Sequence, residues 1–206
     1  MVRPLLSSEL ESAVRVLEHA FAADPALSYV LPDEADRERI GPHIARAFLR
    51  YGMSHGTVWV TEDLQGVALR RPPGREEMSL LGMLSSGIAW LPFRLGWRGT
   101  RRLLAAERET NQRHRRIVRG PHWYLWMIGV HPDHQGRGLG AALMARTFDE
   151  ADAVGVPCYL ETSDRRALSI HLHHGFDIIE QGVVPGTDLM VWSMVRPPRR
   201  RLALVG

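Results

Sequence analysis

The 206-residue chain contains no lysine, since all 26 of its Lys and Arg residues are arginines. This absence excludes a P-loop, whose lysine binds the phosphates of a nucleotide. It also excludes Schiff-base catalysis by a lysine amine. Acetylation of the chain's own lysine side chains is excluded on the same ground.

Cysteine is nearly absent as well, with Cys158 the single example. One cysteine can build neither an internal disulfide framework nor a cysteine-based zinc site, which needs several thiolates. We expect a reducing, cytoplasmic location, with Cys158 serving as a small buried hydrophobic residue. No feature of the sequence activates it as a nucleophile.

Long apolar runs are missing too. The first ten residues lack a basic region followed by an apolar one, so no signal peptide is predicted. The most apolar stretch, 88–97, contains an arginine and a proline and is far shorter than the ~20 residues of a membrane span. We therefore expect no membrane partner. The length predicts a single domain at 1–196, followed by a loose, Arg-rich tail at 197–206.

Helical and strand patterns alternate along the chain. Helices are predicted at about 8–22, 40–51, 100–118, 139–154 and 164–174, with Ser8 and Glu11 as a capping box for the first. Strands are predicted at 57–61, 66–69, 124–130, 158–162, 176–184 and 189–195. This order predicts an α/β fold class with a layered domain.

A glycine-rich loop at 135–140 follows the strand at 124–130 and precedes a helix. Glycines permit a tight turn, and the unpaired N–H groups of a helix's first turn can bind a phosphate or pyrophosphate. The spacing does not match the dinucleotide fingerprint Gly-x-Gly-x-x-Gly. Taken alone, the loop is equally compatible with a generic turn.

The run from Met127 to Gly140 resembles the acetyl-CoA signature of the GNAT N-acetyltransferases. In that family a Val-x-Pro strand end precedes Gln/Arg-x-x-Gly-x-Gly/Ala, and here the slots are filled by Val130, Pro132, Gln135, Gly138 and Gly140. His-Gly-Phe at 174–176 is a second family landmark. Trp-Tyr-Leu at 123–125 and Leu-Glu-Thr-Ser at 160–163 resemble the puromycin N-acetyltransferase branch.

The resemblance implies a mixed, mostly antiparallel sheet that splays between its fourth and fifth strands and is flanked by helices. It implies acetyl-CoA as co-substrate and no metal. The backbone of Ile128 and Val130 would bond the pantetheine, and Ile128 would also polarise the acetyl carbonyl. The amides from Gln135 to Ala141 would hold the pyrophosphate. The full set of expected cofactor contacts is Ile128, Gly129, Val130, Gln135, Gly136, Arg137, Gly138, Leu139, Gly140, Ala141, Ser163 and Ser169.

The catalytic acid is expected at an unusual position. Many family members place a tyrosine four residues before the glycine of the second landmark, and this chain has His171 there. A histidine can protonate a thiolate near neutral pH, although a polar helix end explains it equally well. A metal site formed with His173 and His174 is disfavoured, because the three residues do not share one helical face.

Glu161 is the candidate base. Strand alternation places it on the same face as Tyr159, from which it could take the proton of an amine. The competing interpretation is a glutamate that pairs with one of the many arginines.

The predicted function is therefore transfer of an acetyl group from acetyl-CoA to a primary amine of a small molecule, by direct attack in a ternary complex. An aminonucleoside-type or antibiotic-like aromatic amine is the favoured acceptor, and the protein is expected to be a monomer or homodimer. The segment 88–97 either shapes the acceptor site or belongs to the core or a dimer surface.

One other interpretation stays open. The histidine in place of tyrosine is compatible with a regulator that binds CoA or another ligand with little turnover. Nucleic-acid binding is not expected, because Glu107 and Glu109 interrupt the arginines of 98–119 and no nucleic-acid motif accompanies them.

Overall fold

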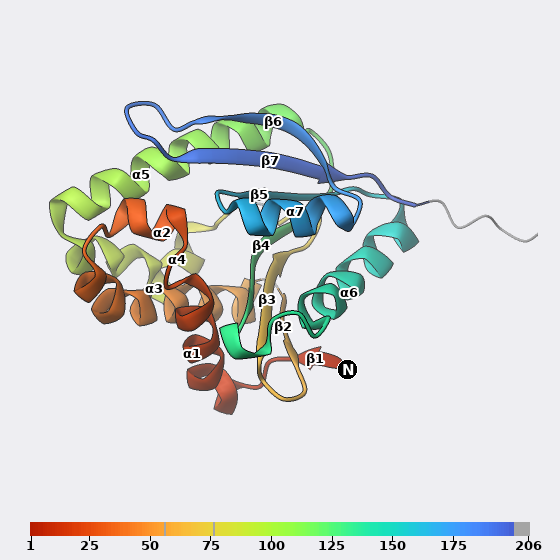
Figure 1. Ribbon diagram of the computed structural model, residues 1–206, viewed down its shortest axis with the longest axis horizontal. Coiled ribbons are helices and arrows are strands. Elements are labelled where there is room, and N and C mark those ends of the chain that lie inside the picture. The colour runs from red at the N-terminus through yellow and green to blue at the C-terminus, as the bar shows by residue number, and fades with distance from the viewer. Residues whose placement is uncertain (56, 76, 200–206) are drawn as a thin grey trace, which may run out of the picture.

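The computed structural model describes residues 1–55, 57–75 and 77–199, arranged as one seven-stranded sheet with helices on both faces (Figure 1). The strand order is β1-β2-β3-β4-β5-β7-β6. The strands are β1 (Val2–Pro4), β2 (Thr57–Thr61), β3 (Gly66–Arg71), β4 (Trp123–Val130), β5 (Cys158–Thr162), β6 (Asp177–Val183) and β7 (Met190–Arg196). The helices are α1 (Leu10–Phe21), α2 (Pro25–Val30), α3 (Glu34–His55), α4 (Leu80–Ser86), α5 (Leu91–Ile117), α6 (Leu139–Val154) and α7 (Arg165–His173). Short 3-10 turns lie at Ser7–Glu9, Ile88–Trp90 and Pro132–His134.

Alternation along the strands divides the core into two layers. Val67 and Leu69 of β3 pack against α1 and α3. Arg70, pointing the other way, bonds to Thr147 and Glu150 of α6. In β5, Leu160 belongs to a cluster that includes Ala151 of α6. Tyr159 and Glu161 therefore face the side of the sheet that carries α1 and α3.

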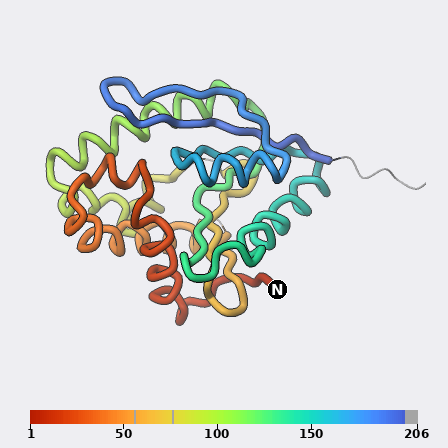
Figure 2. Tube along the Cα trace, viewed as in Figure 1, coloured from red at the N-terminus to blue at the C-terminus, as the bar shows by residue number. Residues whose placement is uncertain are grey.

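The sheet splays between β4 and β5, as the family resemblance implies. These two strands run parallel and pair over two residues each. Trp123 lies opposite Cys158, and Tyr124 lies opposite Tyr159. Beyond these pairs β4 continues beside β3, whereas β5 continues beside β7. Figure 1 shows the two strands leaving each other in different directions, and Figure 2 shows the same divergence along the Cα trace. The remaining sheet pairings are antiparallel, so the mixed α/β fold is confirmed.

Several local predictions are wrong or incomplete. The capping box of Ser8 and Glu11 does not form, because α1 begins after Glu9 and its N-cap makes no side-chain bond. The helix predicted at 40–51 extends over Glu34–His55 and contains Pro42. The long basic helix begins earlier than predicted, at Leu91, and bends at Gly96, whose φ of 66° lies in the left-handed region. The predicted Arg-rich tail lies outside the described residues from 200 onward.

Helix α5 belongs to the segment between β3 and β4. It crosses the face of the sheet near β6 and β7, where the guanidinium of Arg113 donates to the backbone carbonyls of Gly182 and Val191 (Figure 1). This inserted helix covers the same face that carries Tyr159 and Glu161.

Candidate active site

A β-bulge in β4 sets which backbone groups face the splay. The register passes from Leu69 opposite Met127 to Arg70 opposite Leu125, which leaves Trp126 without a partner. Trp126 and Met127 accordingly pack on the same side, against the α1 and α3 cluster. After the bulge, each side chain of β4 points to the face of the sheet opposite to the one that the alternation before the bulge would give it.

The N–H groups of Ile128 and Val130 point toward the splay. The N–H of His131 donates to the carbonyl of Gln65, on the β3 side of β4. Because successive residues of a strand point their backbone groups in opposite directions, the N–H of Gly129 faces β3 and those of Ile128 and Val130 face β5. The side-chain amide of Gln135 donates to the Val130 carbonyl across the same edge. The N–H groups of two of the predicted backbone contacts, Ile128 and Val130, thus face the splay and not β3.

Gly129 has a packing role at this place. A Cβ on this glycine would lie 2.9 Å from the Cβ of Ala20 and 2.9 Å from Cδ2 of Leu17. The absent side chain lets α1 approach the strand.

The glycine-rich loop leads into α6 with its amides exposed. Gly136 and Gly138 have φ values of 74° and 78°, a conformation that glycine adopts without strain. Gly138 is the N-cap of α6 and offers no side-chain cap, so the first-turn amides at 139–141 have no intrahelical partner. These amides and the positive end of the helix dipole suit a phosphate or pyrophosphate group. An added Cβ at Gly136 or Gly138 would meet no atom within 4 Å, so the loop lies open.

Glu161 is held by two tyrosine hydroxyls. Tyr159 donates to Oε1 of Glu161 at 2.6 Å, and Tyr124 of β4 donates to Oε2 at 2.9 Å. Burial raises the pKa of Glu161 to about 7, and the two hydrogen bonds lower it against that effect. In the part of the chain that the structure describes, Glu161 forms no ion pair with an arginine. The alternative interpretation, a glutamate that pairs with an arginine, is therefore not supported.

The side chains around this carboxyl come from α5 and from the end of β3. His114 stacks on the ring of Tyr159, with centroids 4.4 Å apart and planes 6° apart, and its centroid lies 4.7 Å from that of Tyr124. Glu107, about two turns before His114 on α5, has its pKa raised by burial and in turn raises the pKa of Glu161. The Arg71 guanidinium lies 5.8 Å from the centroid of the Tyr124 ring. Its positive charge lowers the pKa of Glu107 against the effect of burial.

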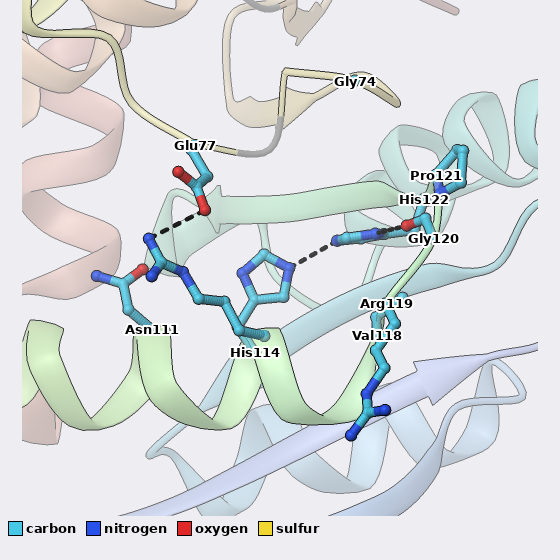
Figure 3. A pocket seen from close by; sticks show the side chains of 10 residues that line it. Gly74, Glu77, Asn111, His114, Val118, Arg119, Gly120, Pro121 and His122 are labelled. Atoms are coloured by element: carbon cyan, nitrogen blue, oxygen red, sulfur yellow. Dashed lines mark hydrogen bonds and ion pairs between the residues drawn. The ribbon is translucent and has the colours of Figure 1, made fainter.

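Figure 3 shows a cavity lined by His114, one of these three rings. It has a volume of about 350 Å³ and is bounded by α5 and the turn before β4. His114 and His122 line it with their Nε2 atoms 2.6 Å apart, and His122 Nδ1 lies 2.7 Å from the Gly120 carbonyl oxygen. Because a carbonyl can only accept, Nδ1 of His122 carries a proton, and in the neutral pair His114 donates from Nε2.

His171 lies on α7, across the sheet from Glu161's face. Burial lowers the pKa of this imidazole to about 4, so it is neutral at pH 7. Its Nδ1 is buried and has no hydrogen-bond partner among the described residues. A neutral imidazole can donate a hydrogen bond to a leaving sulfur, but it is a weaker proton source than an imidazolium.

The two predicted serine contacts stand at the start of the same helix. Ser163 follows β5 and precedes Asp164, whose carboxylate accepts the N–H of Arg166 as the N-cap of α7. The hydroxyl of Ser169 donates to the Arg165 carbonyl. Neither arrangement by itself identifies a ligand contact, so both serines stay predictions.

The shared face of Glu161 and Tyr159 was predicted from the sequence and is confirmed, whereas Tyr124, Glu107 and His114 were not predicted as neighbours of this carboxyl. The register of β4 against β5 brings Tyr124 to Glu161, and the placement of α5 brings Glu107 and His114 there.

Within the described residues no group of three or more His, Cys, Asp or Glu could hold a metal ion. The aromatic residues of 88–97 are not core, because Trp90, Phe93 and Trp97 are exposed.

Comparison with known proteins agrees with this geometry. The profile of the acetyltransferase (GNAT) family matches residues 81–176. An uncharacterized N-acetyltransferase of Schizosaccharomyces pombe is 26% identical over 201 residues, covering 93% of this chain and 81% of the yeast protein.

Two solved structures share the fold across nearly the whole chain. A histone acetyltransferase HPA2 and related acetyltransferase from Corynebacterium glutamicum aligns with a TM-score of 0.64 at 20% identity, covering 98% of both chains. Arylalkylamine N-acetyltransferase 2 from Aedes aegypti aligns with a TM-score of 0.64 at 13% identity, covering 97% of this chain and 99% of the mosquito protein. The splayed sheet, the signature loop and the profile match make the chain similar to the GNAT acetyltransferases, and the two solved structures show that it has their fold.

Proposed function

We propose that this acetyltransferase moves the acetyl group of acetyl-CoA to a primary amine of a small aromatic molecule, by direct attack in a ternary complex. The observation that carries the proposal is the Glu161 carboxyl, held by two tyrosine hydroxyls beside the splay with a pKa of about 7. A base is most effective when its pKa lies near the working pH.

Each step of the proposed reaction is assigned to a named group. As the amine nitrogen bonds to the carbonyl carbon of the thioester, Glu161 accepts the proton that the amine must lose. The N–H of Ile128 donates to the carbonyl oxygen as negative charge develops there, a contribution of roughly 3 kcal/mol in comparable acyl transfers. The carbon–sulfur bond then breaks, and the CoA thiolate leaves and takes up one proton.

His171 is the residue proposed to stabilise the departing sulfur. Its neutral ring and its unbonded, buried Nδ1 suit it to exchanging a hydrogen bond with a ligand in the splay. The pKa of about 4 makes this hydrogen-bonding role more favourable than full proton donation near neutral pH.

The cofactor contacts follow from the exposed amides. The first turn of α6 and the loop at 135–138 would hold the pyrophosphate, and the backbone of Ile128 and Val130 would bind the pantetheine. No metal takes part in the proposed reaction.

The acceptor is proposed to present both an amine and an aromatic surface. Tyr124, Tyr159 and His114 pack their buried rings on one another beside the carboxyl, and from this aromatic wall we infer an acceptor with an aromatic or cationic group. An aminonucleoside such as puromycin and the arylalkylamines fit this description.

A thiol-release assay over a panel of amines tests the function. We expect acetyl-CoA-dependent release with at least one aromatic primary amine, and none with the matching tertiary amine. Panel members should include puromycin, an arylalkylamine and an amino acid.

The depressed pKa of His171 also favours a second candidate, a CoA-binding regulator with little turnover. Tight acetyl-CoA binding in titration calorimetry, together with no thiol release across the panel, would support the regulator and contradict the enzyme.

A further inference from the structure

One segment of the chain, from α4 into α5, combines exposed apolar groups with positive charge. Residues 78–106 contain four arginines and no aspartate or glutamate. The side chains of Trp90, Phe93 and Trp97 are 59%, 81% and 79% exposed. Four leucines of the same segment are also exposed, and they are Leu80, Leu81, Leu84 and Leu104. We call these seven residues, with Arg94, Arg98 and Arg101, the α4–α5 surface.

The arrangement on α5 is amphipathic. Trp97, Arg101 and Leu104 are spaced at i, i+4 and i+7, so they lie on one face of the helix. The opposite face carries Gly99 and His114, which are buried. At the start of α5 the Trp90 and Phe93 rings lie 5.9 Å apart. After the bend at Gly96, the exposed face of α5 therefore carries an aromatic, a guanidinium and an aliphatic group, and a pair of aromatic rings lies before the bend.

The arginines of this surface are free to meet an anionic partner. Within the described part of the chain, Arg94, Arg98 and Arg101 form no ion pair with a carboxylate. Arg94 lies 3.2 Å from Nε2 of His43, which supplies no negative charge.

The charge argues against a second copy of the chain as the partner. In a twofold dimer the same patch meets itself, which brings two positively charged patches together with no carboxylate in the segment to pair with the arginines. Single-stranded nucleic acid would stack on the aromatic rings, but four of the seven apolar groups are leucines, which offer no stacking surface.

We propose that the α4–α5 surface binds the surface of an anionic lipid bilayer, with Trp90, Phe93, Trp97 and the leucines at the headgroup boundary and the arginines on the lipid phosphates. Aromatic and leucine side chains beside arginines are typical of helices that lie in the plane of a membrane interface. No helix in the described residues is long and apolar enough to cross a membrane. Interfacial binding needs no such helix, so the proposal revises our expectation that the chain has no membrane partner.

Sedimentation with sucrose-loaded vesicles tests the proposal on the full chain. We expect binding to vesicles of equal parts phosphatidylglycerol and phosphatidylcholine at 0.1 M NaCl, at least tenfold weaker binding to pure phosphatidylcholine, and release at 0.5 M NaCl. The double variant Phe93→Ser/Trp97→Ser should lose at least tenfold in affinity. Both side chains are about four-fifths exposed, so the fold should survive, which its thermal melting checks.

Matched controls make the test specific. Ile179→Ser on β6 removes an exposed apolar residue elsewhere, and Arg15→Glu on α1 reverses an exposed arginine elsewhere. Both should bind vesicles like the parent, whereas Arg98→Glu/Arg101→Glu should not bind. The proposal is overturned if anionic vesicles fail to sediment the protein, or if the Phe93/Trp97 variant binds as the parent does. A stable dimer that dissociates in that variant would also overturn it.

Discussion

The hydroxyl of Tyr159 donates to the carboxylate of Glu161 at 2.6 Å, two residues further along the same strand. Strand alternation brings the two side chains to one face, and the burial of Tyr159 fixes its ring beneath His114. The hydrogen bond stabilises the ionised carboxylate, while burial destabilises it. The balance between these two effects places the pKa near 7, where a base can both take and release a proton.

Replacing Glu161 by glutamine should remove the base. We expect kcat to fall by about 10²- to 10⁴-fold, the usual contribution of a positioned base. In the parent, kcat/KM should rise with pH through about 7 as the carboxyl loses its proton, and this rise should vanish in Glu161→Gln. The exposed Glu62→Gln is the matched control and should leave the profile unchanged. An unaltered pH profile in Glu161→Gln would remove Glu161 from the mechanism.

Replacing Tyr159 by phenylalanine should move the same pH profile. The lost hydrogen bond had lowered the pKa of Glu161, so the rise in kcat/KM should shift to a pH above 7. Activity should fall strongly at pH 6.5 and return toward the parent value at pH 9, where the carboxylate is ionised in both proteins. Tyr29→Phe, on α2, is the control. An equal loss at both pH values would indicate a structural defect instead.

The shared face of Tyr159 and Glu161, which are close in the sequence, was predicted. The contacts with residues far away in the sequence were not predicted. Tyr159 and Glu161 belong to one strand, so alternation alone placed them on one face. Tyr124 reaches Glu161 only because β4 and β5 pair in parallel at Tyr124 and Tyr159, and this register depends on packing over the whole sheet. His114 depends in turn on where the inserted helix α5 crosses the sheet.

The missed elements of the fold are short. Strand β1 has three residues and α2 has six, too few for a periodic pattern to show. A signal for α2 was nevertheless present, because Asp24 accepts the N–H of Leu27 and Pro25 occupies the first helical position. The glycine-rich loop was predicted correctly because its positive φ values require glycine at fixed positions.

Two substitutions at Gly140 should distinguish the effect of an added side chain from the effect of an added negative charge at the start of α6. An added Cβ there would meet only Cγ2 of Val130 at 3.8 Å, so Gly140→Ala should bind acetyl-CoA within about threefold of the parent. Gly140→Glu places a carboxylate beside the amides proposed to hold the pyrophosphate, and its affinity should fall at least 100-fold. Titration calorimetry measures both. Equal binding by the glutamate variant would show that the cofactor lies elsewhere.

Replacing His171 by glutamine should make the protein less sensitive to acid. The pKa of His171 is about 4 in the folded chain, below the ordinary value of 6.5. Between pH 6.5 and 4 the unfolded chain binds a proton that the folded chain does not. The free energy of unfolding therefore falls as the pH falls, by up to about 3 kcal/mol from this group.

Above pH 6.5 this contribution is fully present, so the parent and His171→Gln should differ there only through packing. Thermal melting at pH 7.5 and pH 5 measures the effect, and the drop in melting temperature should be smaller in His171→Gln than in the parent. His173→Gln, at an exposed position of the same helix, should behave like the parent. An equal drop in His171→Gln and the parent would mean that the imidazole of His171 protonates in the folded protein as easily as in the unfolded chain. The same imidazole would then be cationic below pH 6.5, and direct proton donation to the CoA thiolate would become the better account of its role.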